Sequence, residues 1–417
     1  MNKKFFVILL LIILIPLISK GAGFLSANDS TTCIINNGKL FCDGAILKEY
    51  RDLKQQFTNF SSVNLVSVGG SSINFVDNNT VYSYGFNASR TNFQPTPVLS
   101  GLSIKQITSG SSHTCVLTNE TKDAVKCWGI NNNGQLGNST TTNSISPVIP
   151  SNLYNPKCES VLQIATHNNH VCALILFDKD CTNIPYTYVK CWGANNFGQI
   201  GNGKAINDYL DTRPPSANNI FEQVLRKLFP KKQKPPQEIK PVIASVILEK
   251  TVFQVATGNN HTCYLYSIPL VGNFAKCFGL NNYGQLGNGI DLNKLKDSKT
   301  PLPYEKNPVL VTNLETNVSF IASGDNHNCA IVNNGQVKCW GNNQYGQLGD
   351  GTKINRSTPV LVSGISNAVS LSLGAYHSCA LLKTGEVKCW GNNNSGQLLD
   401  GTKDNRALPA SAAIYQK

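Results

Sequence analysis

Apolar and polar positions alternate in short stretches along most of the chain, and turn residues separate these stretches. The segment 327–341 reads His-Asn-Cys-Ala-Ile-Val-Asn-Asn-Gly-Gln-Val-Lys-Cys-Trp-Gly. Its apolar stretches flank Asn333-Asn334-Gly335, which predicts a β-hairpin with a three-residue loop and the glycine in the left-handed position. Lys383-Thr384-Gly385 and the dipeptide Asn37-Gly38 predict similar hairpins.

This hairpin belongs to a unit that recurs along the chain. Five copies align closely, beginning at Gly110, Thr166, Gly258, Gly324 and Gly374, and two weaker copies cover Cys33–Cys42 and Phe75–Gly85. The 394 residues after position 23, divided among seven copies, give roughly 56 residues each, enough for four short strands. Even spacing of such units predicts an all-β protein, a seven-bladed β-propeller.

The two ends of the repeat array differ from the other copies. The first copy appears without a strand before its hairpin, whereas the last continues from Leu408 to Ile414. We therefore expect the N-terminal hairpin and the C-terminal strand to share one blade, which closes the ring and removes its open edges.

The N-terminus has the pattern of a secretory leader. Lys3 and Lys4 precede an apolar run from Phe5 to Ser19, and the small residues Gly21, Ala22 and Gly23 follow. As a helix the run is about 22 Å long, short of the ~30 Å hydrocarbon core. The pattern predicts a signal peptide over 1–23 and a secreted chain over 24–417, periplasmic if the source is bacterial. An uncleaved membrane anchor is the alternative.

Fourteen cysteines fit an oxidising compartment better than the cytosol. Counting outward from each turn places cysteines face to face across the hairpins. The predicted disulfides are Cys33–Cys42, Cys115–Cys127, Cys172–Cys191, Cys263–Cys277, Cys329–Cys339 and Cys379–Cys389, and the remaining Cys158 and Cys181 would pair with each other. Zinc is the competing use, but His-x-Cys with a second Cys supplies three ligands per unit and a structural zinc site takes four.

The charge balance changes this picture only slightly. The net charge is +12, but charged residues make up 14% of the chain against roughly 25% in an average globular protein. This mild excess argues against nucleic acid as the principal partner.

The repeats resemble those of the regulator of chromosome condensation family. The resemblance rests on Gly-x-x-His, on Cys-Trp-Gly-x-Asn-x-x-Gly-Gln-Leu-Gly and on a later Pro-Val, and it covers nearly all of residues 31–417. It implies a seven-bladed propeller, in agreement with the count above. The paired cysteines are a departure from the nuclear and cytosolic members of the family. In this feature the chain resembles secreted, cysteine-bearing versions of the repeat.

Residues that recur in every strong copy suggest structural roles. His113, His170, His261, His327 and His377 occupy one repeat position, whereas a catalytic residue needs a unique environment. Trp128, Trp192, Trp340 and Trp390, with Phe278 in the fifth unit, are expected to fill the space between blades. We predict no catalytic residue, no metal site and no cofactor. His167 alone lies outside the repeat, and no triad is evident near it.

Two features are candidates for partner binding. Phe197, Tyr283 and Tyr345 precede the Gly-Gln glycine at loop tips, where they either contact a partner or pack on the next turn. An insertion at about 204–247 interrupts the repeats and carries a basic cluster, Arg226, Lys227, Lys231, Lys232 and Lys234. Insertions of this kind often carry specificity. The cluster is either a solvated loop or a contact for a protein or an anionic membrane surface.

These observations predict a secreted, non-enzymatic binding propeller with an unidentified protein or cell-surface partner. The alternative is a guanine-nucleotide exchange factor for a small GTPase, the activity for which the family is named, but such a protein works inside the cell. Asn-x-Ser/Thr sequons, among them Asn59, Asn87, Asn119, Asn138, Asn260 and Asn317, are potential glycosylation sites in a eukaryotic source.

Overall fold

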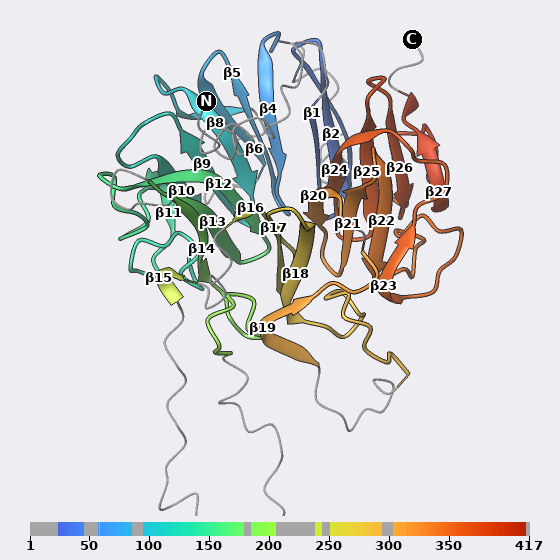
Figure 1. Ribbon diagram of the computed structural model, residues 1–417. Coiled ribbons are helices and arrows are strands. Elements are labelled where there is room, and N and C mark those ends of the chain that lie inside the picture. The colour runs from blue at the N-terminus through green and yellow to red at the C-terminus, as the bar shows by residue number, and fades with distance from the viewer. Residues whose placement is uncertain are drawn as a thin grey trace, which may run out of the picture.

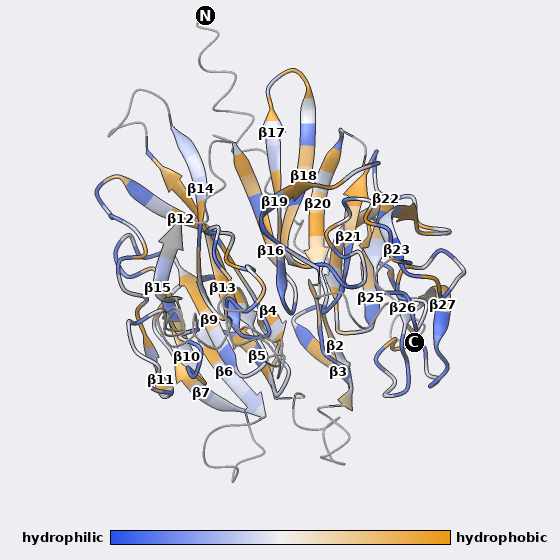
Figure 2. Cartoon of the chain, turned by 90° about the horizontal axis from the view of Figure 1, so that it is seen from below, coloured by the Kyte–Doolittle hydropathy of each residue, from blue (hydrophilic) through white to orange (hydrophobic). Residues whose placement is uncertain are grey.

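The computed structural model describes residues 24–45, 57, 59–85, 95–178, 185–205, 238–243, 251–293, 303–314 and 316–413. These residues form seven antiparallel sheets, six of four strands and one of three, arranged as the blades of a β-propeller (Figure 1). The all-β, seven-bladed prediction is confirmed. Most of the hydrophobic residues lie in the strands, whereas the connecting loops are mostly hydrophilic (Figure 2).

The strands follow the chain from one blade to the next. Blade 1 contains β1 (Phe24–Asn28), β2 (Thr31–Asn36) and β3 (Lys39–Gly44); blade 2 contains β4 (Val63–Val68), β5 (Ser72–Asp77), β6 (Thr80–Gly85) and β7 (Thr96–Leu99). Blade 3 contains β8 (Ile104–Ser109), β9 (His113–Thr118), β10 (Val125–Gly129) and β11 (Ser144–Val148); blade 4 contains β12 (Glu159–His167), β13 (His170–Phe177), β14 (Tyr186–Gly193) and β15 (Glu238–Ile243).

Blades 5 to 7 repeat the arrangement. Blade 5 contains β16 (Val252–Thr257), β17 (His261–Ile268), β18 (Gly272–Leu280) and β19 (Tyr304–Leu310). Blade 6 contains β20 (Val318–Ser323), β21 (His327–Val332), β22 (Gln336–Gly341) and β23 (Arg356–Leu361). Blade 7 contains β24 (Ala368–Leu373), β25 (His377–Leu382), β26 (Val387–Gly391) and β27 (Arg406–Ser411).

Antiparallel pairing gives the propeller two distinct faces. The turn between the first and second strands of a blade and the loop between the third and fourth lie at the same end, which we call the loop face. The hairpin turn between the second and third strands lies at the other end, which we call the hairpin face. In blade 6, Asp325 and Tyr345 are on the loop face and Asn334 is on the hairpin face.

The strand registers of the hairpins place the cysteines opposite each other, as counting outward from the turns predicts. Cys329 lies directly opposite Cys339, and the other predicted hairpin pairs are opposed in the same way. The structure contains disulfides at Cys33–Cys42, Cys115–Cys127, Cys172–Cys191, Cys263–Cys277, Cys329–Cys339 and Cys379–Cys389. Cys158 is also disulfide-bonded, while Cys181 lies outside the described residues. All ten hairpin cysteines of blades 3 to 7 are fully buried, as is Cys33, so most of these bonds lie in the core.

The Gly-Gln loops of blades 3, 5 and 6 each hold the tryptophan of the following blade. The indole Nε1 of Trp340 donates to the carbonyl oxygen of Gln285 at 3.0 Å, and that of Trp390 donates to Gln347 at 2.8 Å. A Cβ at Gly349 would lie 2.8 Å from the Trp390 indole nitrogen, so the motif needs glycine there. In blade 7 the equivalent position is Leu399, because blade 1 has Asp43 in place of a tryptophan after its second cysteine.

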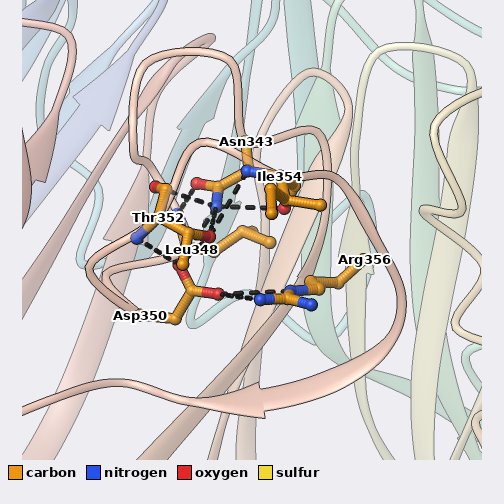
Figure 3. Close-up of polar contacts among 6 residues, drawn as sticks. All are labelled: Asn343, Leu348, Asp350, Thr352, Ile354 and Arg356. Carbon is orange, nitrogen blue, oxygen red and sulfur yellow. Dashed lines mark hydrogen bonds and ion pairs between the residues drawn. The ribbon is translucent and has the colours of Figure 1, made fainter.

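A buried asparagine organises the loop that follows. The Asn343 amide nitrogen donates to the carbonyl oxygens of Thr352 and Ile354, both at 3.1 Å, and to the Asp350 carboxylate, also at 3.1 Å (Figure 3). Its Oδ1 accepts the backbone N–H of Leu348 at 2.9 Å. Arg356 pairs with Asp350 at 3.0 Å, which fixes the start of β23. The frequent asparagines of the repeat are therefore loop scaffolds.

The ring closes differently from our prediction. The first copy has its own inner strand, β1, and β27 pairs with β26 inside blade 7. Blades 7 and 1 meet side by side instead of sharing a sheet, with blue β1 next to red β24 in Figure 1. The Ala27 N–H donates to the Ser372 hydroxyl at 2.7 Å, and the Ala375 N–H donates to the Asp29 carbonyl at 2.9 Å. Because β1 begins directly after the leader pattern and carries no repeat motif, its sequence gave no sign of a strand.

The end of the predicted insertion also needs correction. Residues 238–243 form β15, the outer strand of blade 4, with Cys191 opposite Val242. The segment therefore returns to the propeller before position 247. Residues 206–237, which include Asn219–Phe229 and all five basic candidates, lie outside the described residues. Among the residues that the structure describes, no helix is long and apolar enough to span a bilayer.

Candidate binding face

The five recurring histidines tie neighbouring blades together below the loop face. Each imidazole Nε2 contacts a side chain of the next blade, for example His327 with the Ser378 hydroxyl at 2.9 Å and His377 with the Thr32 hydroxyl at 2.7 Å. His261 Nε2 contacts the Asn328 Oδ1 at 3.0 Å, and because the Asn328 amide donates to Gln285, the imidazole must be the donor. The remaining contacts are His113–Thr166 and His170–Thr262.

These histidines are neutral, structural groups. All five are buried, and desolvation lowers the pKa of His113, His170 and His327 to about 3 and that of His261 and His377 to about 4. In blades 3, 5, 6 and 7 the glycine three residues earlier is required by the same packing, since a Cβ at Gly374 would lie 2.1 Å from the His377 ring.

One pair of side chains spans the central channel at the loop face. The His167 imidazole Nε2, at the end of β12 in blade 4, lies 2.6 Å from the Asp325 carboxylate in blade 6. Asn168 contacts Asn259, and the Asn28 amide donates to the Ser109 carbonyl at 3.3 Å, joining blade 1 to blade 3. These contacts narrow the channel where the inner strands end.

A second carboxylate, that of Asp29, lies near this pair. Burial raises the pKa of Asp29, and the Asp325 carboxylate raises it further, while His167 acts in the opposite direction. Burial also acts to raise the pKa of Asp325, but the hydrogen bond from His167 and the charge of that ring hold it below its ordinary value. His167 therefore keeps Asp325 ionised and acts as a strut between blades.

The aromatic loop tips lie on the same face. Tyr345 of blade 6 makes an edge contact with Tyr376 of blade 7, with ring centroids 5.2 Å apart, and Phe197 of blade 4 contacts Tyr304 of blade 5 at 6.3 Å. Phe197, Tyr283 and Tyr345 are all half-buried. Each of the three side chains is therefore partly packed and partly exposed, and contact of the exposed part with a partner stays a prediction.

Three exposed lysines lie in the outer loops of the loop face. Lys353 and Lys403 occupy equivalent positions in the outer loops of blades 6 and 7, Lys204 lies in the corresponding loop of blade 4, and all three are exposed. The described residues on either side of the basic insertion, Ala205 and Glu238, both lie at the loop face of blade 4. Of the predicted partner-binding residues, the structure thus brings Phe197, Tyr283 and Tyr345 to one face, and the basic cluster lies outside the described residues.

Inside the ring, the inner strands enclose a polar cavity of about 200 Å³. Gln106, Gln163 and Gln254 each bridge to the next inner strand by two backbone hydrogen bonds of 2.7–3.0 Å. The polar lining is largely engaged in holding the blades together. Among the described residues, no group of three or more His, Cys, Asp or Glu side chains is arranged to hold a metal ion.

Sequence reasoning missed the central residues of this face. Asp325 stands in a variable position of a Gly-x-x-His turn, Asp29 in a copy with no recognised first strand, and His167 in the place of the glycine of such a turn. No local spacing links them, because 158 residues separate His167 from Asp325. The only sequence signal for these residues is that they differ from the repeat consensus, as was already visible for His167.

The fold and this face define a propeller built from seven related blades. The RCC1-like domain matches residues 36–415, so the chain belongs to that family. Membership supports a protein-binding, scaffold or exchange-factor role, and propellers of this family are generally regulators without catalytic activity of their own.

Similar proteins share the repeat or the fold over part of their length. The ultraviolet-B receptor UVR8 of Arabidopsis thaliana is 29% identical over 65% of this chain and 49% of its own length, so the chain matches about half of that relative. The human E3 ubiquitin-protein ligase HERC2 is 26% identical over 63% of this chain, but over only 4% of HERC2. Yeast RCC1 (Prp20), solved bound to Kap60, superposes with a TM-score of 0.65 at 16% identity, covering 91% of this chain and 79% of that one. Human WBSCR16 gives 0.61 at 20% identity, covering 84% and 82%. At these identities the two structures show the fold alone.

Proposed function

We propose that this protein is a secreted, non-enzymatic propeller that binds a protein through its loop face. The observation that carries the proposal is the gathering on one face of the half-exposed rings of Phe197, Tyr283 and Tyr345 and the exposed Lys204, Lys353 and Lys403. Aromatic residues are favoured as anchors in protein interfaces, and rim charges steer association.

The compartment is supported by two independent features. Disulfides in six hairpins persist in oxidising surroundings and are rare in the cytosol. The first strand of the propeller begins at Phe24, directly after the predicted cleavage region near Gly23, so removal of a leader over 1–23 leaves every blade intact.

The charges indicate the kind of partner. Three exposed lysines lie on the loop face, and the sequence between its residues Ala205 and Glu238 contains the basic segment 226–234, so an acidic protein surface would complement these charges. The alternative remains exchange activity on a small GTPase, which is favoured by membership of the RCC1-like family. Export and disulfide formation oppose that alternative, because small GTPases act inside the cell.

Site-specific crosslinking tests the binding face. A photoreactive phenylalanine analogue is placed at Tyr345, or at Asn334 on the hairpin face as the matched control, and the full chain is irradiated with extracellular material from the producing cells. We expect a discrete crosslinked product at 345 and none at 334. Poly-glutamate should compete with it and poly-lysine should not. Equal products at both positions, or a product at 334 alone, would contradict the proposed face.

Charge reversal tests the rim. Lys353→Glu with Lys403→Glu should lower the crosslinking yield and raise the apparent Kd by about threefold to tenfold, since each exposed ion pair contributes roughly 0.2–1 kcal/mol. Lys383→Glu, an equally exposed lysine on the hairpin face, should leave binding unchanged. Similar losses in both variants would exclude a specific role for the loop-face lysines.

A further inference from the structure

The glycosylation sequons are divided between the two faces of the propeller. In the described residues, Asn59, Asn78, Asn119 and Asn317 are exposed, whereas Asn28, Asn138, Asn260, Asn355 and Asn393 are half-buried or buried. Each is followed two positions later by Ser or Thr with no intervening proline. Asn87 lies outside the described residues.

All four exposed sequons lie at the hairpin face. Asn78 is in the turn between β5 and β6, and Asn119 follows β9 directly. Asn317 precedes β20 and bridges to Asn273, near the turn between β17 and β18. Asn59 is two residues before Ser61, whose carbonyl oxygen lies against the Asn37-Gly38 turn. A glycan at any of these positions would extend from the hairpin face into solvent.

The exposed asparagines can accept a glycan without losing their contacts. Asn119 donates one hydrogen bond from Nδ2 to the Ser103 hydroxyl at 2.5 Å, and Asn78 donates one to the Asp77 carboxylate at 3.1 Å. An N-linked amide keeps one N–H, so either bond can persist after the sugar is attached.

The other sequons are built into the propeller. Asn393 is fully buried, and its Nδ2 donates to the Asp400 carboxylate and to the Thr402 carbonyl, at 3.0 and 3.1 Å. Both amide hydrogens are engaged, so a glycan there would break the loop. Asn28, also buried, donates to Ser109 across the channel.

The three half-buried sequons belong to the loop face. The Oδ1 of Asn138 accepts from the Asn131 amide and from the Thr140 hydroxyl, which is the hydroxyl of its own sequon. Asn260 accepts from Gln199, and Asn355 accepts from the Asn343 backbone at 2.8 Å. Their side chains are held inward as parts of the loops.

We infer that Asn59, Asn78, Asn119 and Asn317 are N-glycosylation sites and that the five other sequons in the described residues carry no glycan. The inference rests on the proposed export of the chain and concerns passage through a eukaryotic secretory pathway. Glycans cover the hairpin face and leave the aromatic and lysine-bearing loop face open to a protein partner. One end of the propeller is therefore shielded, and the other is available for recognition.

Site mapping tests the inference. The full chain is produced in cultured eukaryotic cells and recovered from the medium. Glycans are released enzymatically in heavy-oxygen water, which labels each formerly glycosylated asparagine as aspartate, and the peptides are sequenced by mass spectrometry. We expect label at the four hairpin-face positions and none at Asn28, Asn138, Asn260, Asn355 or Asn393. Label at any of these five positions, or an exported chain with no label at the four, overturns the inference.

Matched variants and a second preparation separate the possible failures. Thr121→Ala should remove the mass of one glycan from the protein, whereas Ser357→Ala, in the sequon of Asn355, should leave its mass unchanged apart from the substitution. Residues 24–417 are also produced behind the leader of an exported protein. If only this second preparation is exported, the proposed secretion is wrong, yet its label pattern still decides the glycan placement.

Discussion

Blades 2 and 6 have the same four-stranded architecture but are held by different interactions. In blade 6, a disulfide joins Cys329 to Cys339, and His327 contacts Ser378 of the next blade. In blade 2 the opposed residues at the equivalent position are Asn74 and Ser83. A serine, Ser72, stands in the place of the histidine.

Blade 2 replaces the covalent bond with aromatic packing and a polar contact. The buried Phe75 ring lies 4.8–5.7 Å, between centroids, from the rings of Phe57, Phe60 and Tyr82. The Asn74 amide donates to the Ser109 hydroxyl of blade 3 at 3.0 Å. Strand pairing is thus sufficient to form the blade. The disulfide adds stability that other interactions can supply in its place.

Reduction of all the disulfides should have the largest effect. Closing a hairpin loop of about ten residues stabilises by roughly 2–3 kcal/mol, so several such bonds together are comparable with the net stability of a domain. We expect the Tm measured by intrinsic fluorescence to fall steeply in reductant, or the ring to unfold at room temperature. An unchanged Tm with complete reduction, verified by thiol labelling, would show that the bonds do not brace the blades.

Single-blade variants sharpen the comparison. Phe75→Ala should cost about 3–5 kcal/mol through the cavity it leaves in blade 2. Cys329→Ala with Cys339→Ala should cost about 2–3 kcal/mol. Denaturant unfolding measures both. Because only the cysteine variant lacks a bond that reductant breaks, reductant should destabilise it less than it destabilises the Phe75 variant. Equal loss of stability in reductant for the two variants would contradict the disulfide between Cys329 and Cys339.

The missing disulfide can be installed in blade 2. Asn74 lies directly opposite Ser83, as Cys329 lies opposite Cys339, so Asn74→Cys with Ser83→Cys should form the bond. We expect a gain of about 1–2 kcal/mol, less than the full loop-closure value because the Asn74 hydrogen bonds are lost. The reduced form of the same variant is the control and should be less stable than the reduced wild type.

Acid should weaken the blades that contain histidine. The folded-state pKa of these histidines lies at about 3 or 4, below the unfolded value near 6.5. The unfolded chain therefore binds more protons between these values, and stability is present above about pH 6.5 and is lost as the pH falls. Each histidine should cost roughly 1–2 kcal/mol by about pH 5.

A histidine variant isolates this effect. His327→Gln should be less stable at neutral pH, because its contact with Ser378 changes, but its stability should fall less steeply with acid. A second variant, Ser72→Ala in blade 2, should keep the wild-type slope. Parallel plots of unfolding free energy against pH for His327→Gln and the wild type would contradict the claim that His327 is buried and neutral in the folded state.

Much of the fold was predictable because the repeat carries its own register. The turns at Asn37-Gly38 and Asn333-Asn334-Gly335 fix which residues face each other, and the cysteines mark those positions. Local spacing could not reveal β1, whose sequence Phe-Leu-Ser-Ala-Asn lacks a motif and follows an apolar leader. It also could not reveal β15, which contains Pro241 and lies beyond the long insertion.

The candidate face was predictable only in part. Phe197, Tyr283 and Tyr345 share one repeat position, so their placement at the same end follows from the repeat. The contact between His167 and Asp325 depends on the ring that brings blades 4 and 6 together on either side of blade 5, and no spacing within one unit encodes it. Recurring residues are thus readable from the sequence, whereas contacts across the channel require the closed propeller.

The most direct test of the account is the intact mass of the native protein, taken separately from medium and cell lysate, with glycans removed and with and without reduction. We predict a chain in the medium that lacks about 23 N-terminal residues, the length of the predicted leader, and is lighter by one hydrogen for each of its 14 cysteines. A full-length, fully reduced chain confined to the lysate would contradict the account and would make GTPase exchange the leading function.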